Sequence, residues 1–72
     1  MSKIVAVSMA IKNALMMCRE WREMECCGNA IIELCTAFEM DDEEIIEALK
    51  FASGNSVQED DFIDNMIANI QL

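Results

Sequence analysis

The chain has 72 residues, a net charge of −9 and a hydrophobic fraction of 54%. A chain this short builds one core and buries only about 60% of its unfolded surface, which excludes several domains. The apolar fraction argues against intrinsic disorder despite the charge. Because proline is absent and strong helix formers are frequent, we expect an all-α protein. The predicted architecture is a compact four-helix domain of two helical hairpins, spanning residues 1–72.

The first predicted helix runs from Ser2 to about Met24. Apolar side chains recur in this segment at spacings of three and four, which is typical of a helix with one buried stripe. The stripe consists of Ile4, Val7, Ile11, Ala14, Cys18 and Trp21. Gly28 and Asn29 then offer a C-cap glycine and an N-cap asparagine, so we place the first chain reversal at residues 26–29.

The second predicted helix extends from about Ala30 to Met40. The side chains expected on its inner face are Ile31, Leu34, Cys35 and Phe38. Residues 18 and 35 would lie at similar heights in a hairpin of these two helices. A disulfide between Cys18 and Cys35 is then geometrically conceivable, although both side chains also suit buried positions as small hydrophobic groups.

Two further helices are predicted in the acidic half of the chain. An aspartate at position 41 or 42 can cap the third helix, which ends before Gly54. Its inner face consists of Ile45, Ala48, Leu49 and Ala52. Ser56 stands three residues before Glu59, the spacing of a capping box, and begins the fourth helix. The apolar stripe of that helix consists of Ile63, Met66, Ile67 and Ile70, with Phe62 beside it.

The charge is distributed unevenly along the chain. Residues 1–38 contain four basic and four acidic side chains, whereas the remainder has ten acids against Lys50 alone and so accounts for the whole net charge. The ten acids are Glu39, Asp41, Asp42, Glu43, Glu44, Glu47, Glu59, Asp60, Asp61 and Asp64. Many of them fall in the first turns of the third and fourth helices, where negative charge suits the helix dipole.

Two interpretations of these acids remain open. In one, they cap helices and form a solvated face. In the other, which we favour, they form a negative surface that binds a basic partner protein. A narrower version has this surface imitate the phosphates of a nucleic acid and occupy the basic groove of a DNA- or RNA-binding protein, as small phage-type inhibitors do. Direct binding to nucleic acid is disfavoured because the chain offers no basic patch.

A second apolar stripe on the first helix suggests another contact. Val5, Met9 and Met16 fall opposite the main stripe, at about 100° per residue. Either the first helix is central and buried on two sides, or these residues form a surface for another chain. Exposed apolar patches often mark interfaces, and methionine adapts well to them. We therefore expect a homodimer that associates through Val5, Met9 and Met16, and a structural or assembly subunit is the alternative function.

The sequence offers little support for catalysis or for a cofactor. It has no histidine, no tyrosine and no glycine-rich phosphate loop, so we predict that the protein is not an enzyme. Its four cysteines, at positions 18, 26, 27 and 35, lack the paired spacing of structural zinc sites. We predict no metal and no cofactor, and we expect Cys26 and Cys27 to be the more exposed thiols.

The cellular location of the protein is predicted from the apolar segments of the sequence. The apolar stretch from Ile4 to Ile11 is interrupted by Lys12 and Asn13, which disfavours a signal peptide. No apolar run approaches the roughly 20 residues needed to cross a bilayer. We therefore expect a cytoplasmic, non-enzymatic regulator or inhibitor that does not bind membranes.

Overall fold

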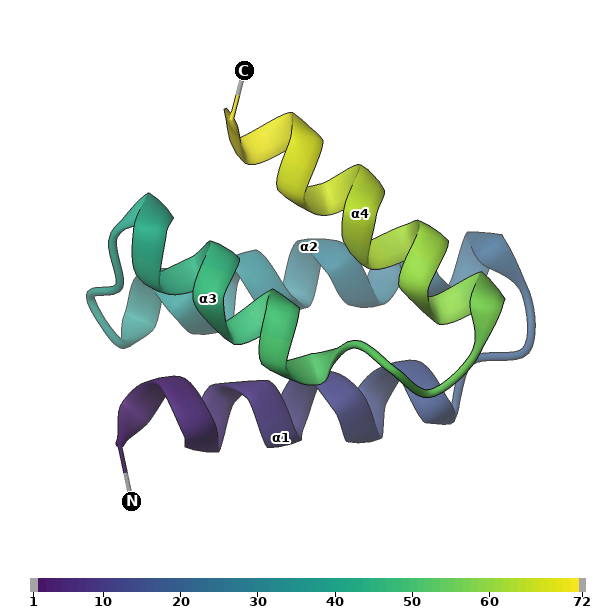
Figure 1. Ribbon diagram of the computed structural model, residues 1–72, viewed down its shortest axis with the longest axis horizontal. Coiled ribbons are helices and arrows are strands. Elements are labelled where there is room, and N and C mark those ends of the chain that lie inside the picture. The colour runs from purple at the N-terminus through teal and green to yellow at the C-terminus, as the bar shows by residue number, and fades with distance from the viewer. Residues whose placement is uncertain (1, 72) are drawn as a thin grey trace.

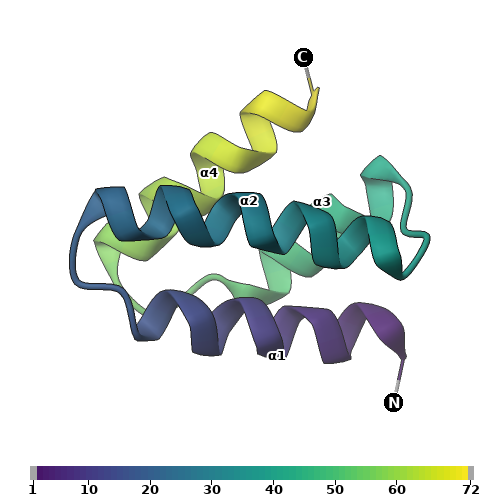
Figure 2. The same ribbon diagram turned by 180° about the vertical axis from the view of Figure 1, so that it is seen from behind.

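The computed structural model describes residues 2–71, and these residues form four helices and no strand. They are α1 (Lys3–Met16), α2 (Trp21–Ala37), α3 (Asp42–Ala52) and α4 (Val57–Gln71). Helices α1 and α2 run in opposite directions in one layer, and α3 and α4 form a second layer against them (Figures 1 and 2). The prediction of an all-α four-helix domain is confirmed.

The first chain reversal lies nine residues earlier than the sequence predicted. Helix α1 ends at Met16, and a four-residue link, Met17–Glu20, leads into α2 at Trp21. Glu20 occupies the N-cap position in an extended conformation, with φ −126° and ψ 153°, and its side chain makes no capping hydrogen bond. No glycine, proline or asparagine occurs in the link. Tertiary packing, rather than local helix-breaking chemistry, therefore determines this reversal.

Gly28 has a packing role and does not end a helix. It lies inside α2 and is buried. A Cβ atom added here would come 3.0 Å from Cζ of Phe62 and 3.8 Å from Sδ of Met66, both on α4. The glycine thus allows the Phe62 ring to approach the α2 backbone closely. This close approach is why the predicted turn at residues 26–29 was wrong.

The core is formed by all four helices and by Met40 in the α2–α3 connection. Its most completely buried large side chains are Ile11, Leu15, Met24, Leu49, Ile63, Val7 and Cys35. The predicted inner face of α3 is confirmed in full, because Ile45, Ala48, Leu49 and Ala52 are all buried. The most extensive contact between helices joins α1 to α3.

The buried faces of α1 and α2 differ in detail from the prediction, whereas that of α4 agrees with it. Leu15 and Met24 were missed although both are fully buried, and Phe38, expected inside, is 49% exposed at the C-cap of α2. In α4 the predicted stripe is confirmed: Phe62, Ile63 and Met66 are buried, while Ile67 and Ile70 are partly buried against the core. The error at Phe38 follows from the end of α2, which lies at Ala37 and not at the predicted Met40.

Candidate functional site

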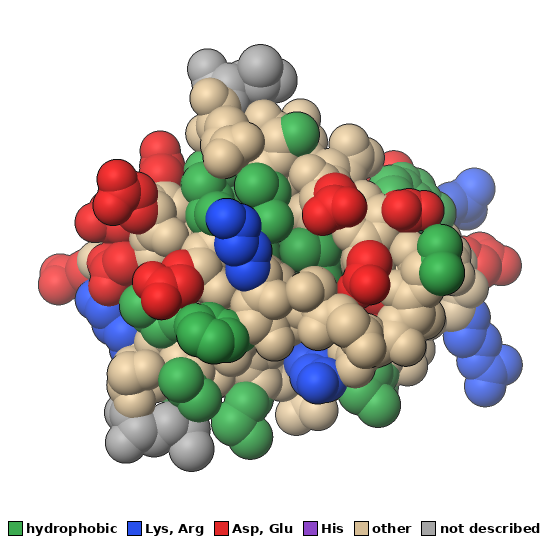
Figure 3. All heavy atoms as spheres, viewed as in Figure 1, with side chains coloured by type: hydrophobic (Ala, Val, Ile, Leu, Met, Phe, Trp, Pro, Cys, Tyr) green, Lys and Arg blue, Asp and Glu red, His purple; other side chains and the backbone are tan. Residues whose placement is uncertain are grey.

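The acidic residues around the start of α3 form an exposed charged surface. Five of them are exposed, and we name them the α3 acidic patch: Glu39, Asp41, Asp42, Glu43 and Glu47. Asp41, Asp42 and Glu43 line a shallow concavity. Figure 3 shows this group of acidic side chains apart from a second group, with basic and hydrophobic side chains between them.

Local hydrogen bonds fix the backbone beneath the α3 acidic patch. Asp41 Oδ1 accepts from the Glu44 amide at 2.8 Å, and Glu44 Oε1 accepts from the Asp41 amide at 3.2 Å, which together make a capping box. The predicted capping role of Asp41 is confirmed. The patch therefore presents its charges from an ordered helix start.

A Schellman motif places Glu39 beside that helix start. The Met40 amide donates to the Cys35 carbonyl at 3.1 Å, and the Glu39 amide donates to the Thr36 carbonyl at 2.9 Å. This geometry requires a left-handed residue at position 39, where Glu39 has φ 56°. The buried Met40 and Cys35 side chains complete the motif. Glu39 therefore points a charge outward from a position that usually holds glycine.

The α3 acidic patch has almost no neutralising partner. Among residues 2–71 the single ion pair joins Lys3 Nζ to Glu44 Oε2 at 3.7 Å, and Lys3 Nζ also donates to the Phe38 carbonyl at 3.3 Å. Lys3 thus links the start of α1 to the α2–α3 connection. Within the described part of the chain, the five residues of the patch itself make no ion pair, so their field reaches solvent.

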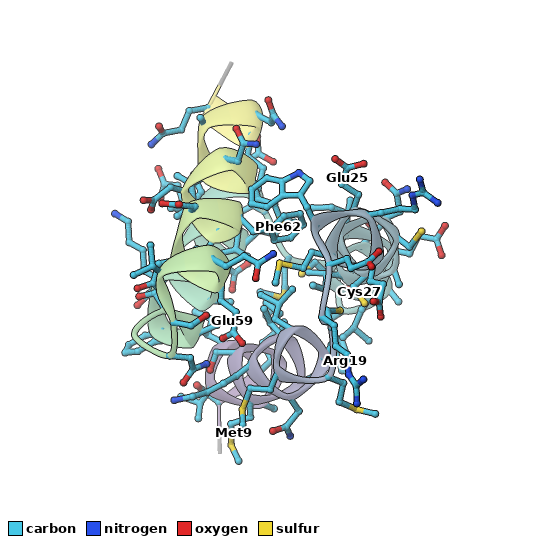
Figure 4. All side chains as sticks on the ribbon, turned by 90° about the vertical axis from the view of Figure 1, so that its right-hand side faces the viewer. Met9, Arg19, Glu25, Cys27, Glu59 and Phe62 are labelled. Atoms are coloured by element: carbon cyan, nitrogen blue, oxygen red, sulfur yellow. The ribbon has the colours of Figure 1, made fainter. Side chains whose placement is uncertain are left out.

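The acids of α4 divide into exposed and structural residues. Asp61 and Asp64 are exposed. Asp60 Oδ1 accepts from the Gly54 amide at 2.8 Å and holds the α3–α4 connection. Glu59 is 9% exposed, its Oε2 has no hydrogen-bond partner, and Figure 4 shows it between α4 and α1. Glu59 is therefore not part of the exposed acidic surface on which the sequence prediction placed it.

Glu59 also shows how the predicted capping box at Ser56 differs from the one at Asp41. Ser56 Oγ accepts from the Glu59 amide at 3.2 Å, as that pattern predicts. The Glu59 carboxylate, however, turns into the protein and leaves one oxygen unpaired. Burying such a group is unfavourable.

The outer face of α1 exposes the residues predicted for self-association. Val5 is 38% exposed, Met9 50% and Met16 61%, and Met17 in the following link reaches 82%. Figure 4 shows Met9 pointing away from the other helices. Since this face is open, α1 is not buried on two sides within one copy of the chain.

A groove between α2 and α4 escaped the sequence prediction. Its volume is about 480 Å³. Gly28, Phe62 and Met66 lie at its base, and its polar residues are Glu25, Asn29, Asn65 and Asn69. Trp21 packs edge-to-face on Phe62, with ring centroids 5.3 Å apart and an interplanar angle of 79°. Asn65 and Asn69, one helical turn apart, are the sequence feature that could have indicated a polar groove on α4. The groove could not be predicted from them alone, because it also depends on Gly28 lying inside α2.

The cysteines are arranged differently from the prediction. Cys35 is buried and Cys26 is exposed, both as expected. Cys27, however, lies within α2 and is partly buried. Cys18 Sγ lies 3.2 Å from Cys27 Sγ, so its neighbour is Cys27 and not Cys35. Within residues 2–71 no group of three or more potential metal ligands is present.

Burial raises the pKa of two of these thiols. The pKa of Cys18 rises from 9.0 to about 11, first because the group is removed from water and then because of its hydrogen bond to Cys27. Burial also raises the pKa of Cys35. Both side chains therefore remain protonated thiols near neutral pH.

Two further findings concern the lengths of the helices and the similarity of the chain to known proteins. No helix in the described part of the chain has the length and apolar character needed to span a membrane. Comparison with protein-family models, with curated proteins and with solved structures gives no match to this chain.

Proposed function

We propose that this protein is a non-enzymatic regulator or inhibitor that binds a basic partner protein through the α3 acidic patch. The observation that carries the proposal is the arrangement of that patch. Five exposed carboxylates surround one capped helix start, and none of them has an ion-pair partner within residues 2–71. Such a surface attracts a positively charged partner over about 8 Å at physiological salt.

A narrower form of the proposal has the carboxylates take the place of nucleic-acid phosphates. The partner would then be a DNA- or RNA-binding protein whose basic groove is occupied by the patch. Arginine and lysine side chains that bind phosphates also form charge-assisted hydrogen bonds with carboxylates. Displacement of the protein from its partner by a nucleic acid supports this form, while unaffected binding would leave only the broader proposal.

The test compares three proteins as baits in a lysate of the source cells, at low and at high salt. The patch variant carries Asp42→Asn, Glu43→Gln and Glu47→Gln, which remove three charges and leave the capping carboxylate of Asp41 intact. The matched control carries Glu20→Gln, Glu23→Gln and Glu33→Gln, three exposed acids outside the patch. Both variants have the same net charge.

We expect the wild type and the matched control to retain the same basic protein at low salt and to release it at high salt. The patch variant should fail to retain that protein, because the local field and not the net charge attracts it. Equal retention by all three proteins at both salt concentrations would contradict the proposal.

A second candidate function is that of a self-associating assembly subunit, supported by the exposed face of α1. Val5, Met9 and Met16 offer an apolar surface, and the expected product is a homodimer. The net charge of −9 opposes association of two copies, so added salt should strengthen such a dimer, in contrast to its effect on an electrostatic contact.

Sedimentation analysis tests the dimer. Met9→Glu with Met16→Glu should yield a monomer if the α1 face is the interface. The matched control is Phe51→Glu with Val57→Glu, which adds the same charge at two apolar positions that are 59% and 79% exposed. Identical behaviour of both double variants would exclude the α1 face as the interface.

A further inference from the structure

The two thiols of Cys18 and Cys27 lie in contact across the α1–α2 reversal. Their sulfur atoms are 3.2 Å apart, and the Cys18 thiol also donates to the Ala14 carbonyl at 3.3 Å. Cys18 belongs to the non-helical link, whereas Cys27 lies in the second turn of α2. Figure 4 shows Cys27 on the side of α2 that faces this link.

The geometry requires little movement for the two sulfurs to bond. A disulfide has an S–S distance of about 2.05 Å, so the atoms must approach by roughly 1 Å. The link can supply this movement, because among the described residues its backbone is held only near its two ends: the Met17 and Cys18 amides donate to the last turn of α1, and the Glu20 carbonyl accepts from the Met24 amide at 3.2 Å. Cys27 is fixed by α2 and need not move.

The other two cysteines are placed less favourably. Cys26 is exposed and, as the helical neighbour of Cys27, points about 100° away from it. Cys35 is fully buried among core side chains. Within this protein the Cys18–Cys27 pair is therefore distinguished by direct contact and by partial access to solvent.

We propose that Cys18 and Cys27 form a reversible intramolecular disulfide when the protein meets a small-molecule disulfide such as oxidised glutathione. One protein thiolate attacks the small disulfide, forms a mixed disulfide and releases the first small thiol. The second protein thiolate then attacks the protein sulfur of that mixed disulfide and releases the second small thiol. The two protein thiols are oxidised by two electrons, and the oxidant is reduced to two thiols.

The environment of Cys18 indicates the order of these steps. Burial and the Cys27 sulfur keep Cys18 protonated at neutral pH, with a pKa of about 11. Cys27 therefore forms the mixed disulfide, and Cys18 closes the bond after losing its proton to solvent. The closing rate should rise with pH around neutrality, in proportion to the thiolate fraction of Cys18.

The disulfide would stabilise the α1–α2 reversal, whose link contains no glycine, proline or asparagine. It closes a ten-residue loop, from position 18 to position 27, and so restricts the unfolded chain. The bond also spans Trp21, the first residue of α2 and one wall of the α2–α4 groove. Oxidation should therefore hold this end of the groove more firmly in place.

The test uses variants that retain only two cysteines each. Cys26→Ser with Cys35→Ser retains the proposed pair, and Cys18→Ser with Cys27→Ser is the matched control with the other pair. Each variant and the wild type are treated with oxidised glutathione. The remaining thiols are then alkylated, and the mass of each protein is measured by mass spectrometry. Circular dichroism establishes that each variant is folded before treatment.

We expect the variant that retains Cys18 and Cys27 to lose both thiols. Its mass should fall by two hydrogen atoms, with no glutathione attached. The control pair should retain its thiols or carry glutathione. In the wild type, the cross-linked peptide should join positions 18 and 27, and the melting temperature should fall by about 10 °C on reduction. A wild type that forms only glutathione adducts, or that joins Cys27 to any other cysteine, would overturn the proposal.

Discussion

Several single residues in this protein have structural roles that cannot be predicted from their residue type. Glycine is usually a helix terminator and glutamate a surface residue, yet Gly28 lies inside α2 and Glu59 is buried. Glu39, by contrast, occupies a left-handed position that favours glycine. Each assignment follows from a neighbour distant in sequence or from backbone geometry. These positions are therefore where residue-level substitutions should be most informative.

Replacing Glu39 with glycine should stabilise the protein. A left-handed conformation costs a residue with a side chain about 1–2 kcal/mol, and glycine loses part of that gain through the entropy of the unfolded chain. We expect the free energy of unfolding, measured with urea, to rise by about 0.5 kcal/mol. Glu39→Gln controls for the lost charge. Gly54→Ala should act in the opposite direction, because Gly54 has φ 99°. A loss of stability in Glu39→Gly would contradict the assigned Schellman motif.

Replacing Gly28 with alanine should destabilise the protein. The added Cβ would lie 3.0 Å from the Phe62 ring, which is itself held by Trp21. Overpacking of this kind costs about 1–3 kcal/mol, and the better helix propensity of alanine offsets up to about 1 kcal/mol. Thermal melting should show a net loss of about 1 kcal/mol. The exposed neighbour supplies a control, since Asn29→Ala gains helix propensity without overpacking and should be slightly stabilising. Phe62→Leu should restore part of the loss in Gly28→Ala.

At the scale of elements, the sequence predicts helices well where their ends are encoded locally. Asp41 with Glu44 marks the start of α3, and Ser56 marks the start of α4. The end of α1 could not be predicted, because Met17–Glu20 contains no helix breaker and Gly28 with Asn29 imitates one. The exposure of Met9 followed from helical periodicity.

A candidate surface could likewise be predicted from the sequence only where its residues lie close together along the chain. The acids of the α3 acidic patch lie near one helix start, so sequence reading could place them together. The α2–α4 groove draws its residues from two helices that are distant in sequence, and it depends on the Gly28–Phe62 contact. Periodicity within one helix carries no information about such a contact. The burial of Glu59 was missed for the same reason.

Removing the cap of α3 should cost stability without changing the fold. Asp41→Ala leaves the Glu44 amide without its side-chain acceptor and should lower the free energy of unfolding by about 1 kcal/mol. Asp42→Ala, next to it, removes the same charge from an exposed site that lacks a capping hydrogen bond. Equal losses in the two variants, measured by urea unfolding, would show that charge and not capping is the cause.

At the scale of the whole molecule, charge opposes compaction. Fourteen acids and five basic residues are held in one small domain, with a single ion pair among residues 2–71. Their mutual repulsion destabilises the folded state more than the expanded one. The hydrophobic core, drawn from all four helices, has to overcome that repulsion.

Added salt should therefore stabilise the wild-type protein. Raising sodium chloride from about 10 mM to about 500 mM shortens the screening length and weakens repulsion among the acids. We expect the melting temperature to rise by several degrees and the rise to be smaller in the triple variant of the α3 acidic patch. A melting temperature independent of salt would show that the charges are too far apart to interact.

The absence of a helix breaker between α1 and α2 has a consequence for folding kinetics. Nothing in Met17–Glu20 prevents residues 3–37 from continuing as one helix, and the largest helix contact joins α1 to α3. Packing on α3 therefore contributes more to the bend between α1 and α2 than the contact of these two helices with each other does. During synthesis, we expect residues 3–37 to fluctuate as one long helix until the acidic half of the chain has left the ribosome. The docking of α1 on α3 should then be the rate-limiting step of folding.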